Sequence, residues 1–240
     1  MDSNCTYFCY KNNKDKIKKI VDNPKKIKLV FFDMDGVLVD SISSWKSIHD
    51  YFGTSNQESV NEYLKGKIND LEFIKRDVLL WNTNGSPTSK DVIKNILYTL
   101  PLMNGAEELI SFLRREKIKT AIVSAGLDIL AEKIAEELGI DYVFANGIKE
   151  DENGRLTGEG ILQVQLTNKE KNVEQLSKKL NIAPEHCAAI GNSCFDVPMF
   201  ETTALGIAFN PEDECVRKSA DIIVEGKDLR KIIPSLKPYL

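Results

Sequence analysis

The stretch IKLVFFDMDGVLVDS, residues 27–41, decides the fold class of this 240-residue chain. Its first six residues are mostly apolar and rich in strand formers, which predicts a buried β-strand. Two carboxylates, Asp33 and Asp35, follow at once, with Gly36 directly behind them. Because burying an acidic pair without a partner is costly, this pattern indicates that a cation or a reaction is located where the strand ends.

Similar apolar runs recur along the rest of the chain, at 118–124, 140–146, 187–192, 205–210 and 220–225. Helical patterns alternate with them. In one pattern Leu127, Leu130, Ile134 and Leu138 share a face and Gly139 ends the helix. This alternation predicts an α/β, Rossmann-like core with a mostly parallel sheet covered on both sides. Residues 149–160 contain Asn-Gly between short polar segments and predict a hairpin.

One long stretch, residues 43–102, contains no convincing strand and instead three or four helical segments. In one of them Leu71, Ile74, Val78 and Trp81 fall on a single stripe. We interpret this stretch as a helical cap inserted after the first strand. The core then comprises residues 27–42 and 103–240, and residues 1–26 form a polar, lysine-rich arm.

Composition excludes several classes of function. The formal net charge of -4 argues against a general nucleic-acid binder. No apolar run approaches the roughly 20 residues that a membrane span requires, and the N-terminus lacks the features of a secretory signal. The five cysteines are scattered and odd in number, which favours reduced thiols and a cytoplasmic location.

Polar groups recur where the predicted strands end. In an open parallel sheet these ends share one rim, where ligands bind. Carboxylates and an amide there favour a hard cation such as Mg2+, while a hydroxyl, backbone N–H groups and a lysine suit a phosphate group. The side chains at strand ends are Asp33, Asp35, Ser124, Asn192, Ser193 and Asp196, and Lys169 lies at the start of the helix that leads into the strand before Asn192.

These motifs, in this order, resemble those of the haloacid dehalogenase superfamily phosphatases, and within them the phosphoserine phosphatase branch. The similarity extends from about Ile27 to the C-terminus. It implies a Mg2+-dependent phosphomonoesterase that acts on a small phosphorylated metabolite through an aspartyl-phosphate intermediate. Two alternatives remain: a phosphotransferase that passes the phosphoryl group to an alcohol, or a catalytically weak phosphate-binding protein. Monomer and homodimer are both left open.

The resemblance also assigns roles to residues in the first two motifs. Asp33 would be the nucleophile, and Asp35 the general acid and later base, with its backbone carbonyl on the metal. A calcium loop or surface turn is the alternative for Asp-x-Asp-Gly, but a buried strand precedes it here. Ser124 and the N–H groups of Ala125 and Gly126 would hold the phosphoryl oxygens, although a serine by itself is usually a helix cap.

The third and fourth motifs complete the predicted site. The leucines of the following helix favour Lys169 over Lys171 as the lysine that offsets charge between nucleophile and phosphate. The predicted metal ligands are Asp33, Asp35, Asn192 and Asp196, the last of them either directly or through water. Asn192 departs from the family pattern, in which an aspartate occupies this position. An amide oxygen can ligate Mg2+ without bringing charge, so we expect weaker metal binding.

Two positions in the predicted cap region bear on substrate recognition. The segment KRDVLLW, residues 75–81, resembles the family segment whose arginine binds the substrate carboxylate, which maps to Arg76; a solvated surface arginine is the alternative. Ile42 falls where the family has a glutamate that binds the substrate amino group. Asp40 and Asp77 are the possible substitutes.

Overall fold

The computed structural model describes residues 25–240, and the predicted polar arm lies outside this range apart from its last two residues. Within it, the strands form one seven-stranded sheet with the order β4-β3-β2-β1-β5-β6-β7. All neighbours are parallel except β3 and β4. The strands are β1 (Leu29–Phe32), β2 (Lys119–Leu127), β3 (Tyr142–Glu150), β4 (Leu156–Ile161), β5 (Cys187–Gly191), β6 (Leu205–Phe209) and β7 (Ile222–Val224).

Strand β1 lies at the centre of the sheet, between β2 and β5. All four of its residues are buried because both faces of the sheet are covered. Val30 and Phe32 belong to one apolar cluster, while Leu29 and Phe31 belong to a second cluster on the opposite face. The central position places Asp33, the next residue, at the carboxyl edge of the sheet.

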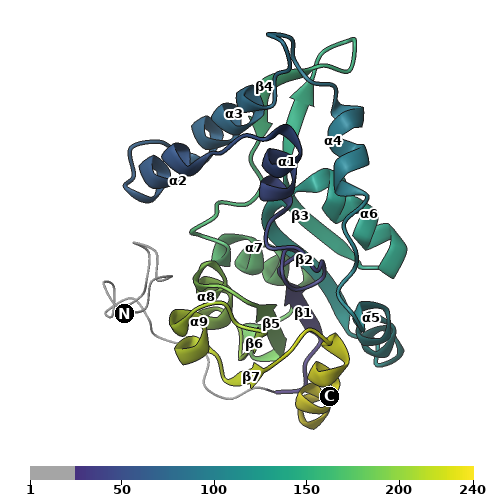
Figure 1. The fold of residues 1–240 in the computed structure, drawn as a ribbon. Helices are drawn as coiled ribbons and strands as arrows, with labels where there is room; N and C mark the ends of the chain where they lie inside the picture. The colour runs from purple at the N-terminus through teal and green to yellow at the C-terminus, as the bar shows by residue number, and fades with distance from the viewer. Residues whose placement is uncertain (1–24) are drawn as a thin grey trace.

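Helices cover the two faces as separate layers (Figure 1). Helices α5 and α6 pack on one side, and α7, α8 and α9 lie on the other (Figure 1). The apolar residues whose spacing predicted α6 and α7 are therefore buried against the sheet. The core helices are α5 (Ala106–Arg115), α6 (Asp128–Leu138), α7 (Glu170–Leu180), α8 (Val197–Glu201), α9 (Glu214–Ser219) and α10 (Ile232–Leu236).

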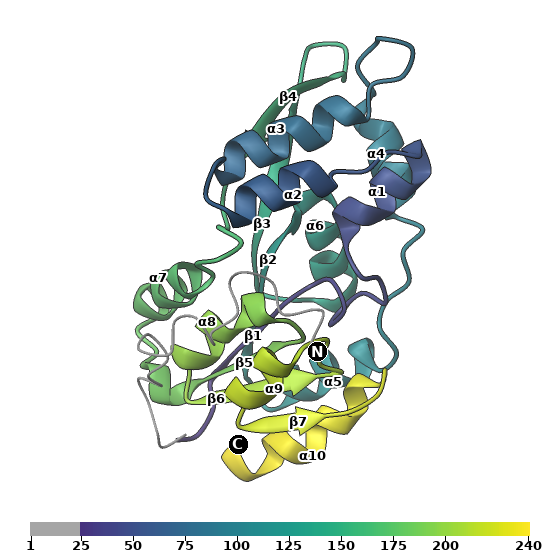
Figure 2. The same ribbon diagram turned by 60° about the vertical axis from the view of Figure 1, so that its left-hand side comes forward.

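The predicted fold class is confirmed, with two differences in strand length. Strand β2 continues through Ser124 to Leu127, and β3 continues through Asn146 to Glu150. The predicted hairpin is present: β3 and β4 pair antiparallel around residues 151–155. The long β3–β4 arm extends away from the core sheet toward the inserted helices (Figure 2).

The insert after β1 contains four helices, α1 (Ser44–Phe52), α2 (Gln57–Leu64), α3 (Asp70–Leu80) and α4 (Lys90–Leu97). Side chains of Ser43, Asn69 and Ser89 cap the N-termini of α1, α3 and α4. Ile74, Val78 and Trp81 are buried as the stripe predicted. Leu71 was assigned to the same stripe wrongly, since it is 45% exposed near the start of α3.

Strand β4 completes the packing of the cap. Gly160 lies so close to α3 that an added Cβ would come within 2.7 Å of Ile74 Cγ2. Gly158 contacts Leu79 of the same helix. The cap layer therefore combines the inserted helices with a hairpin from the core. Among the described helices, none has the length and apolar character that a membrane span demands.

Candidate active site

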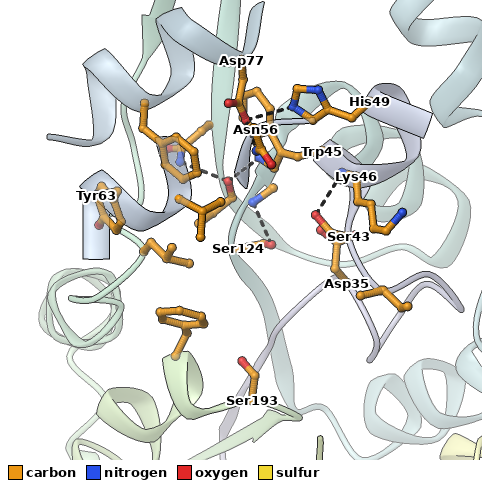
Figure 3. A pocket seen from close by; sticks show the side chains of 18 of the residues that line it. Asp35, Ser43, Trp45, Lys46, His49, Asn56, Tyr63, Asp77, Ser124 and Ser193 are labelled. Carbon is orange, nitrogen blue, oxygen red and sulfur yellow. Dashed lines mark hydrogen bonds and ion pairs between the residues drawn. The ribbon is translucent and has the colours of Figure 1, made fainter. Parts of the chain in front are cut away.

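A cavity of about 570 Å3 lies between cap helices α1 to α3 and the carboxyl edge of the sheet (Figure 3). Its core side is lined by residues that directly follow β1 and β5, by a segment of β2, and by one lysine before α7. The topology thus brings together side chains from four distant parts of the sequence. The core residues that the sequence predicted and that line the cavity are Asp33, Asp35, Ser124, Ala125, Gly126, Lys169, Asn192 and Ser193.

Asp33 is held at the edge of the sheet by the strand hydrogen bond from its N–H to Ile190 O, 3.0 Å long. Its Oδ1 accepts a hydrogen bond from the Met34 N–H at 2.8 Å. Burial raises the pKa of Asp33 to about 7, and the nearby Asp196 carboxylate adds to the shift. Lys169 opposes the rise by favouring the ionised carboxylate.

Lys169 is 2% exposed and bridges two carboxylates. Its Nζ lies 2.9 Å from Asp33 Oδ1 and 2.7 Å from Asp196 Oδ1. Burial lowers the pKa of this ammonium group, but the two carboxylates raise it by more, so the group stays charged. Lys171, the alternative, instead donates to Gln165 Oε1 at an exposed position. The structure therefore brings Lys169 to the predicted nucleophile.

Asp35 is linked to the cap by Ser44, the first residue of α1. Ser44 Oγ donates to Asp35 Oδ2 at 2.9 Å. The other oxygen, Oδ1, is buried and accepts no hydrogen bond from any described residue. Burial raises the pKa of Asp35, despite the hydrogen bonds from Ser44. A carboxyl group in this environment suits proton transfer near neutral pH.

The segment Ser124–Gly126 lies inside β2 and not at its end, where the pairing of β2 with β3 shifts register. The Gly126 N–H donates to Ser124 Oγ at 3.1 Å. An added Cβ on Gly126 would come within 2.5 Å of Met34 Cε, so only glycine fits there. Trp45 of α1 donates from Nε1 to Ala125 O at 3.0 Å. This contact, which the sequence did not indicate, ties the cap to the predicted phosphate-binding segment.

Asp196 does not line the cavity, although we predicted it as a metal ligand. It is fully buried, and its Oδ2 accepts the N–H groups of Asn192 and Ser193 at 2.9 and 3.0 Å. Its Oδ1 is held by Lys169. Both oxygens are thus used to shape the loop after β5 and to position the lysine. The structure does not support a direct metal contact by Asp196.

Asn192 packs against Gly36, and this explains the glycine behind the two aspartates. Gly36 has φ of +74°, and a Cβ on it would come within 2.1 Å of Asn192 Nδ2. Asn192 also donates from Nδ2 to Glu212 Oε1 at 3.1 Å. This bond orients the amide nitrogen toward Glu212 and leaves the amide oxygen as the available metal donor.

Glu212 is a cavity residue that the sequence analysis missed. Burial raises its pKa, as do the neighbouring carboxylates Asp196 and Asp213. The signal was present, because Glu212 follows β6 at the same edge of the parallel sheet. Glu212 places a carboxylate beside the amide of Asn192, and Asn192 is the residue at the position where the family pattern has an aspartate.

The donor set around Asp33 fits a magnesium ion. Among the described residues, no three His, Cys, Asp or Glu side chains are placed to hold an ion together. Mg2+, however, is commonly bound by one or two carboxylates, water and substrate phosphate. Asp33 supplies a hard carboxylate oxygen at the cavity, and the backbone carbonyl of Asp35 would be a hard donor of the same kind. The amide oxygen of Asn192 is of the same chemical kind.

Arg76 lies outside the cavity lining. Its guanidinium pairs with Glu62 and with Glu72, at 2.5 and 2.9 Å. The structure therefore does not support the predicted contact of Arg76 with a substrate carboxylate. The next residue on α3, Asp77, lines the cavity instead, as does Ile42. Asp40 is turned away and pairs with Lys227 at 2.6 Å.

Comparisons with known proteins agree with the fold. A family model described as haloacid dehalogenase-like hydrolase matches residues 27–202. A phosphoserine phosphatase of Archaeoglobus fulgidus is 33% identical over 213 residues, which are 88% of this chain and 60% of that protein. The chain thus spans less than two thirds of the length of this relative.

Two further proteins match over nearly their full length. A phosphoserine phosphatase of Methanocaldococcus jannaschii is 33% identical over 216 residues, covering 89% of this chain and 99% of that protein. A solved structure of a phospho-aspartyl intermediate analogue of phosphoserine phosphatase superposes with a TM-score of 0.74. It is 31% identical and covers 88% of this chain and 99% of that one.

Proposed function

The chain belongs to the haloacid dehalogenase-like hydrolase family, as a phosphatase similar to phosphoserine phosphatases, and we propose that it hydrolyses a small phosphomonoester through an aspartyl-phosphate on Asp33. The observation that carries this proposal is the contact of Lys169 Nζ with Asp33 Oδ1, 2.9 Å long, in the lining of the cavity between cap and core. A buried ammonium beside a carboxylate lets a phosphate dianion approach an oxygen nucleophile.

In the first step, an oxygen of Asp33 bonds to phosphorus while the bond from phosphorus to the ester oxygen breaks. Asp35 gives its proton to the departing alcohol oxygen. Burial favours this role, because it raises the pKa of Asp35 and keeps a proton available. The Ser124 hydroxyl and the nearby N–H groups of β2 bind the equatorial phosphoryl oxygens, and Lys169 balances their charge.

In the second step, Asp35 takes a proton from water, and the hydroxide oxygen bonds to the same phosphorus. The bond from phosphorus to Asp33 breaks, which releases inorganic phosphate and restores the carboxylate. The cap keeps bulk water away from the intermediate, since Trp45 and Ser44 connect α1 to Ala125 and Asp35. Opening of the cap then admits the next substrate.

Asp33, the backbone carbonyl of Asp35 and the amide oxygen of Asn192 would hold Mg2+. When bound, the ion neutralises charge on the phosphoryl oxygens. Asn192 contributes no charge of its own, so the carboxylate of Glu212 beside it supplies the negative charge that this position lacks. A cytoplasmic location stays a prediction, since Cys215 is disulfide-bonded whereas the sequence favoured reduced thiols.

The test uses an aryl phosphate with Mg2+ and measures release of phosphate. We expect Asp33→Asn to lower turnover by about a thousandfold or more, because the amide oxygen is a far weaker nucleophile. Lys169→Ala should lower turnover by at least about a hundredfold. Lys171→Ala is the matched control and should stay within about twofold of the unmodified protein.

Acid quenching tests the intermediate separately. The unmodified protein should carry a covalently bound phosphoryl group after quenching, and Asp33→Asn should carry none. Equal turnover by the unmodified protein and Asp33→Asn would overturn the proposal.

A further inference from the structure

A buried polar cluster lies at the cap end of the cavity, opposite Asp35 and Ser193 (Figure 3). His49 of α1 and Asp77 of α3 are its centre, and they are 3% and 2% exposed. His49 Nε2 lies 3.3 Å from Asp77 Oδ2. Asn56 donates from Nδ2 to the same oxygen at 2.8 Å. Three separate cap segments thus hold one carboxylate against the cavity.

The other ring nitrogen of His49, Nδ1, contacts two further cap residues. The indole N–H of Trp81, which can only donate, points at His49 Nδ1 over 3.2 Å. The hydroxyl of Thr54, 2.8 Å from Nδ1, can donate to the same nitrogen. Nε2 itself makes no hydrogen bond to a described residue, so the hydrogen bond that Asp77 Oδ2 accepts comes from Asn56.

The second oxygen of Asp77 lacks a partner. Oδ1 is buried and accepts no hydrogen bond from the part of the chain that the structure describes. An ionised carboxylate left in this state is costly, so the site is built for a group that donates to it. Since Asp77 lines the same cavity as Asp33 and Asp35, a donor on the substrate can supply that bond.

The charges around the rest of the cavity oppose a substrate carboxylate. Asp50 and Asp70 also line the cap side, whereas Arg76 is paired with two glutamates outside it. Of the described lysines, two line the cavity, and both are engaged: Lys169 with Asp33 and Asp196, and Lys46 with Asp50 at 2.6 Å. Among the described residues that line the cavity, no lysine or arginine is therefore left unpaired to bind a substrate carboxylate.

We propose that the cap selects a phosphomonoester whose alcohol part carries an ammonium group and no carboxylate, and that this ammonium binds Asp77 Oδ1. This inference rests on the proposed function. It names the substrate class as phosphorylated amino alcohols, in contrast to phosphorylated amino acids. The ammonium would donate to Asp77, and a carboxylate on the same substrate would meet the acidic cap wall.

The experiment compares ω-aminoalkyl phosphates of increasing chain length with matched ω-hydroxyalkyl and ω-carboxyalkyl phosphates, and phosphoserine with phosphoethanolamine. The last two differ only in the carboxylate, and the length series finds the distance that reaches Asp77. We expect kcat/KM for the best aminoalkyl phosphate to be at least about tenfold higher than kcat/KM for the hydroxyalkyl phosphate of the same length. A buried carboxylate oxygen discriminates strongly against a substrate that does not supply a matching hydrogen-bond donor. The value of kcat/KM should also be higher for phosphoethanolamine than for phosphoserine.

Asp77→Asn keeps the shape of the side chain and removes its charge. It should lower kcat/KM for the best amine by at least about tenfold more than it lowers kcat/KM for the matched hydroxyl substrate. Glu72→Gln is the matched control: it removes one carboxylate from the same helix, outside the cavity lining, and should preserve the amine preference.

The outcomes separate the two proposals. The inference would be overturned if the protein preferred phosphoserine or another carboxylate substrate, or if the preference for amines survived in Asp77→Asn. Hydrolysis of the aryl phosphate would still support the proposed phosphatase activity in both cases. No hydrolysis of any phosphate above the rate of Asp33→Asn would overturn both. If Asp77→Asn does not fold, the substrate series on the unmodified protein still tests whether amines are preferred over hydroxyl and carboxylate substrates.

Discussion

At the scale of single residues, neighbours decide what each carboxylate does. Asp33 and Asp196 both contact Lys169, yet only Asp33 lines the cavity. Asp196 is covered by backbone N–H groups that hold a loop, while Asp35 keeps one buried oxygen without a bond. The same chemical group therefore serves as candidate nucleophile, as structural anchor and as candidate acid, according to its surroundings.

Gly36 offers a test of this residue-level packing. We expect Gly36→Ala to reduce stability by more than Gly53→Ala. Both glycines have positive φ, which costs about 1–2 kcal/mol for alanine. Only at Gly36 would the new Cβ also overlap Asn192, at 2.1 Å, while nothing lies within 4 Å at Gly53. That overlap should add about 1–3 kcal/mol.

Urea denaturation measures both glycine variants, and titration calorimetry measures their affinity for Mg2+. Gly36→Ala should also weaken Mg2+ binding, because it displaces the amide of Asn192, while Gly53→Ala should leave it unchanged. Equal losses of stability for the two variants would show that Asn192 does not constrain Gly36.

At the scale of elements, the β3–β4 hairpin has a role that its sequence did not suggest. Its polar residues and Asn-Gly turn are typical of an exposed hairpin. In the folded chain, however, β4 packs under α3 and supports the helix that carries Asp77. The position of the cap over the site thus depends on a strand that belongs to the core sheet.

A double-mutant cycle tests this contact. Gly160→Ala should destabilise the protein by about 1–3 kcal/mol, because its Cβ would lie 2.7 Å from Ile74 Cγ2. Ile74→Ala alone should cost about 2–5 kcal/mol by removing a buried side chain. The double variant should cost less than the sum, since each change makes room for the other.

A matched pair provides the reference for the cycle. Ile110 is buried in α5 on the core, so Ile110→Ala and Gly160→Ala should combine additively to within about 0.5 kcal/mol. Urea denaturation gives all the values. Additive costs for Gly160→Ala and Ile74→Ala would show that β4 does not press on α3.

At the scale of the whole molecule, the cap and the core each supply part of one cavity. The core contributes Asp33, Ser124 and Lys169, and the cap contributes Asp77 and Trp45. Neither set is adjacent in sequence to the other, and Ser44 and Trp45 make the hydrogen bonds that join them. The phosphoryl end and the proposed ammonium end of the substrate are therefore bound by different layers.

Metal binding should stabilise the whole fold, with a defined dependence on pH. Burial raises the pKa of Asp33 from 3.8 to about 7, so below pH 7 the metal-free site holds a proton that Mg2+ must displace. The apparent affinity for Mg2+ should therefore fall about tenfold per pH unit below 7 and level off above it. At pH 8, Mg2+ at ten times its dissociation constant should add about 1.4 kcal/mol of stability.

Thermal unfolding with and without Mg2+ measures this effect. The increase in Tm should be present at pH 8 and much smaller at pH 6, with the same Mg2+ concentration. Asn192→Ala removes a candidate ligand and should reduce the increase at both pH values. An increase that is equal at pH 6 and pH 8 would show that no proton leaves Asp33 when Mg2+ binds.

The sequence by itself determined the fold class and the position of the chemistry. The apolar run 27–32 and its repeats predicted the strands, because side chains in a sheet covered on both faces are almost all apolar. The order of strands and helices then placed Asp33 at the carboxyl edge of the sheet, and the resemblance to the phosphatase family added Ser124 and Lys169 to the same site. The fold class and the edge position of Asp33 need only local patterns and the general rules of parallel sheets.

Only the tertiary structure decided which side chains face the cavity. A shift of one position along α3 turns a residue by about 100°, so Arg76 lies outside while Asp77 faces the site. The burial of Asp196, the contact of Gly36 with Asn192 and the approach of Glu212 all depend on loops whose paths no periodicity encodes. Orientation and partner choice arise from packing between distant segments, and a local pattern in the sequence does not specify such packing.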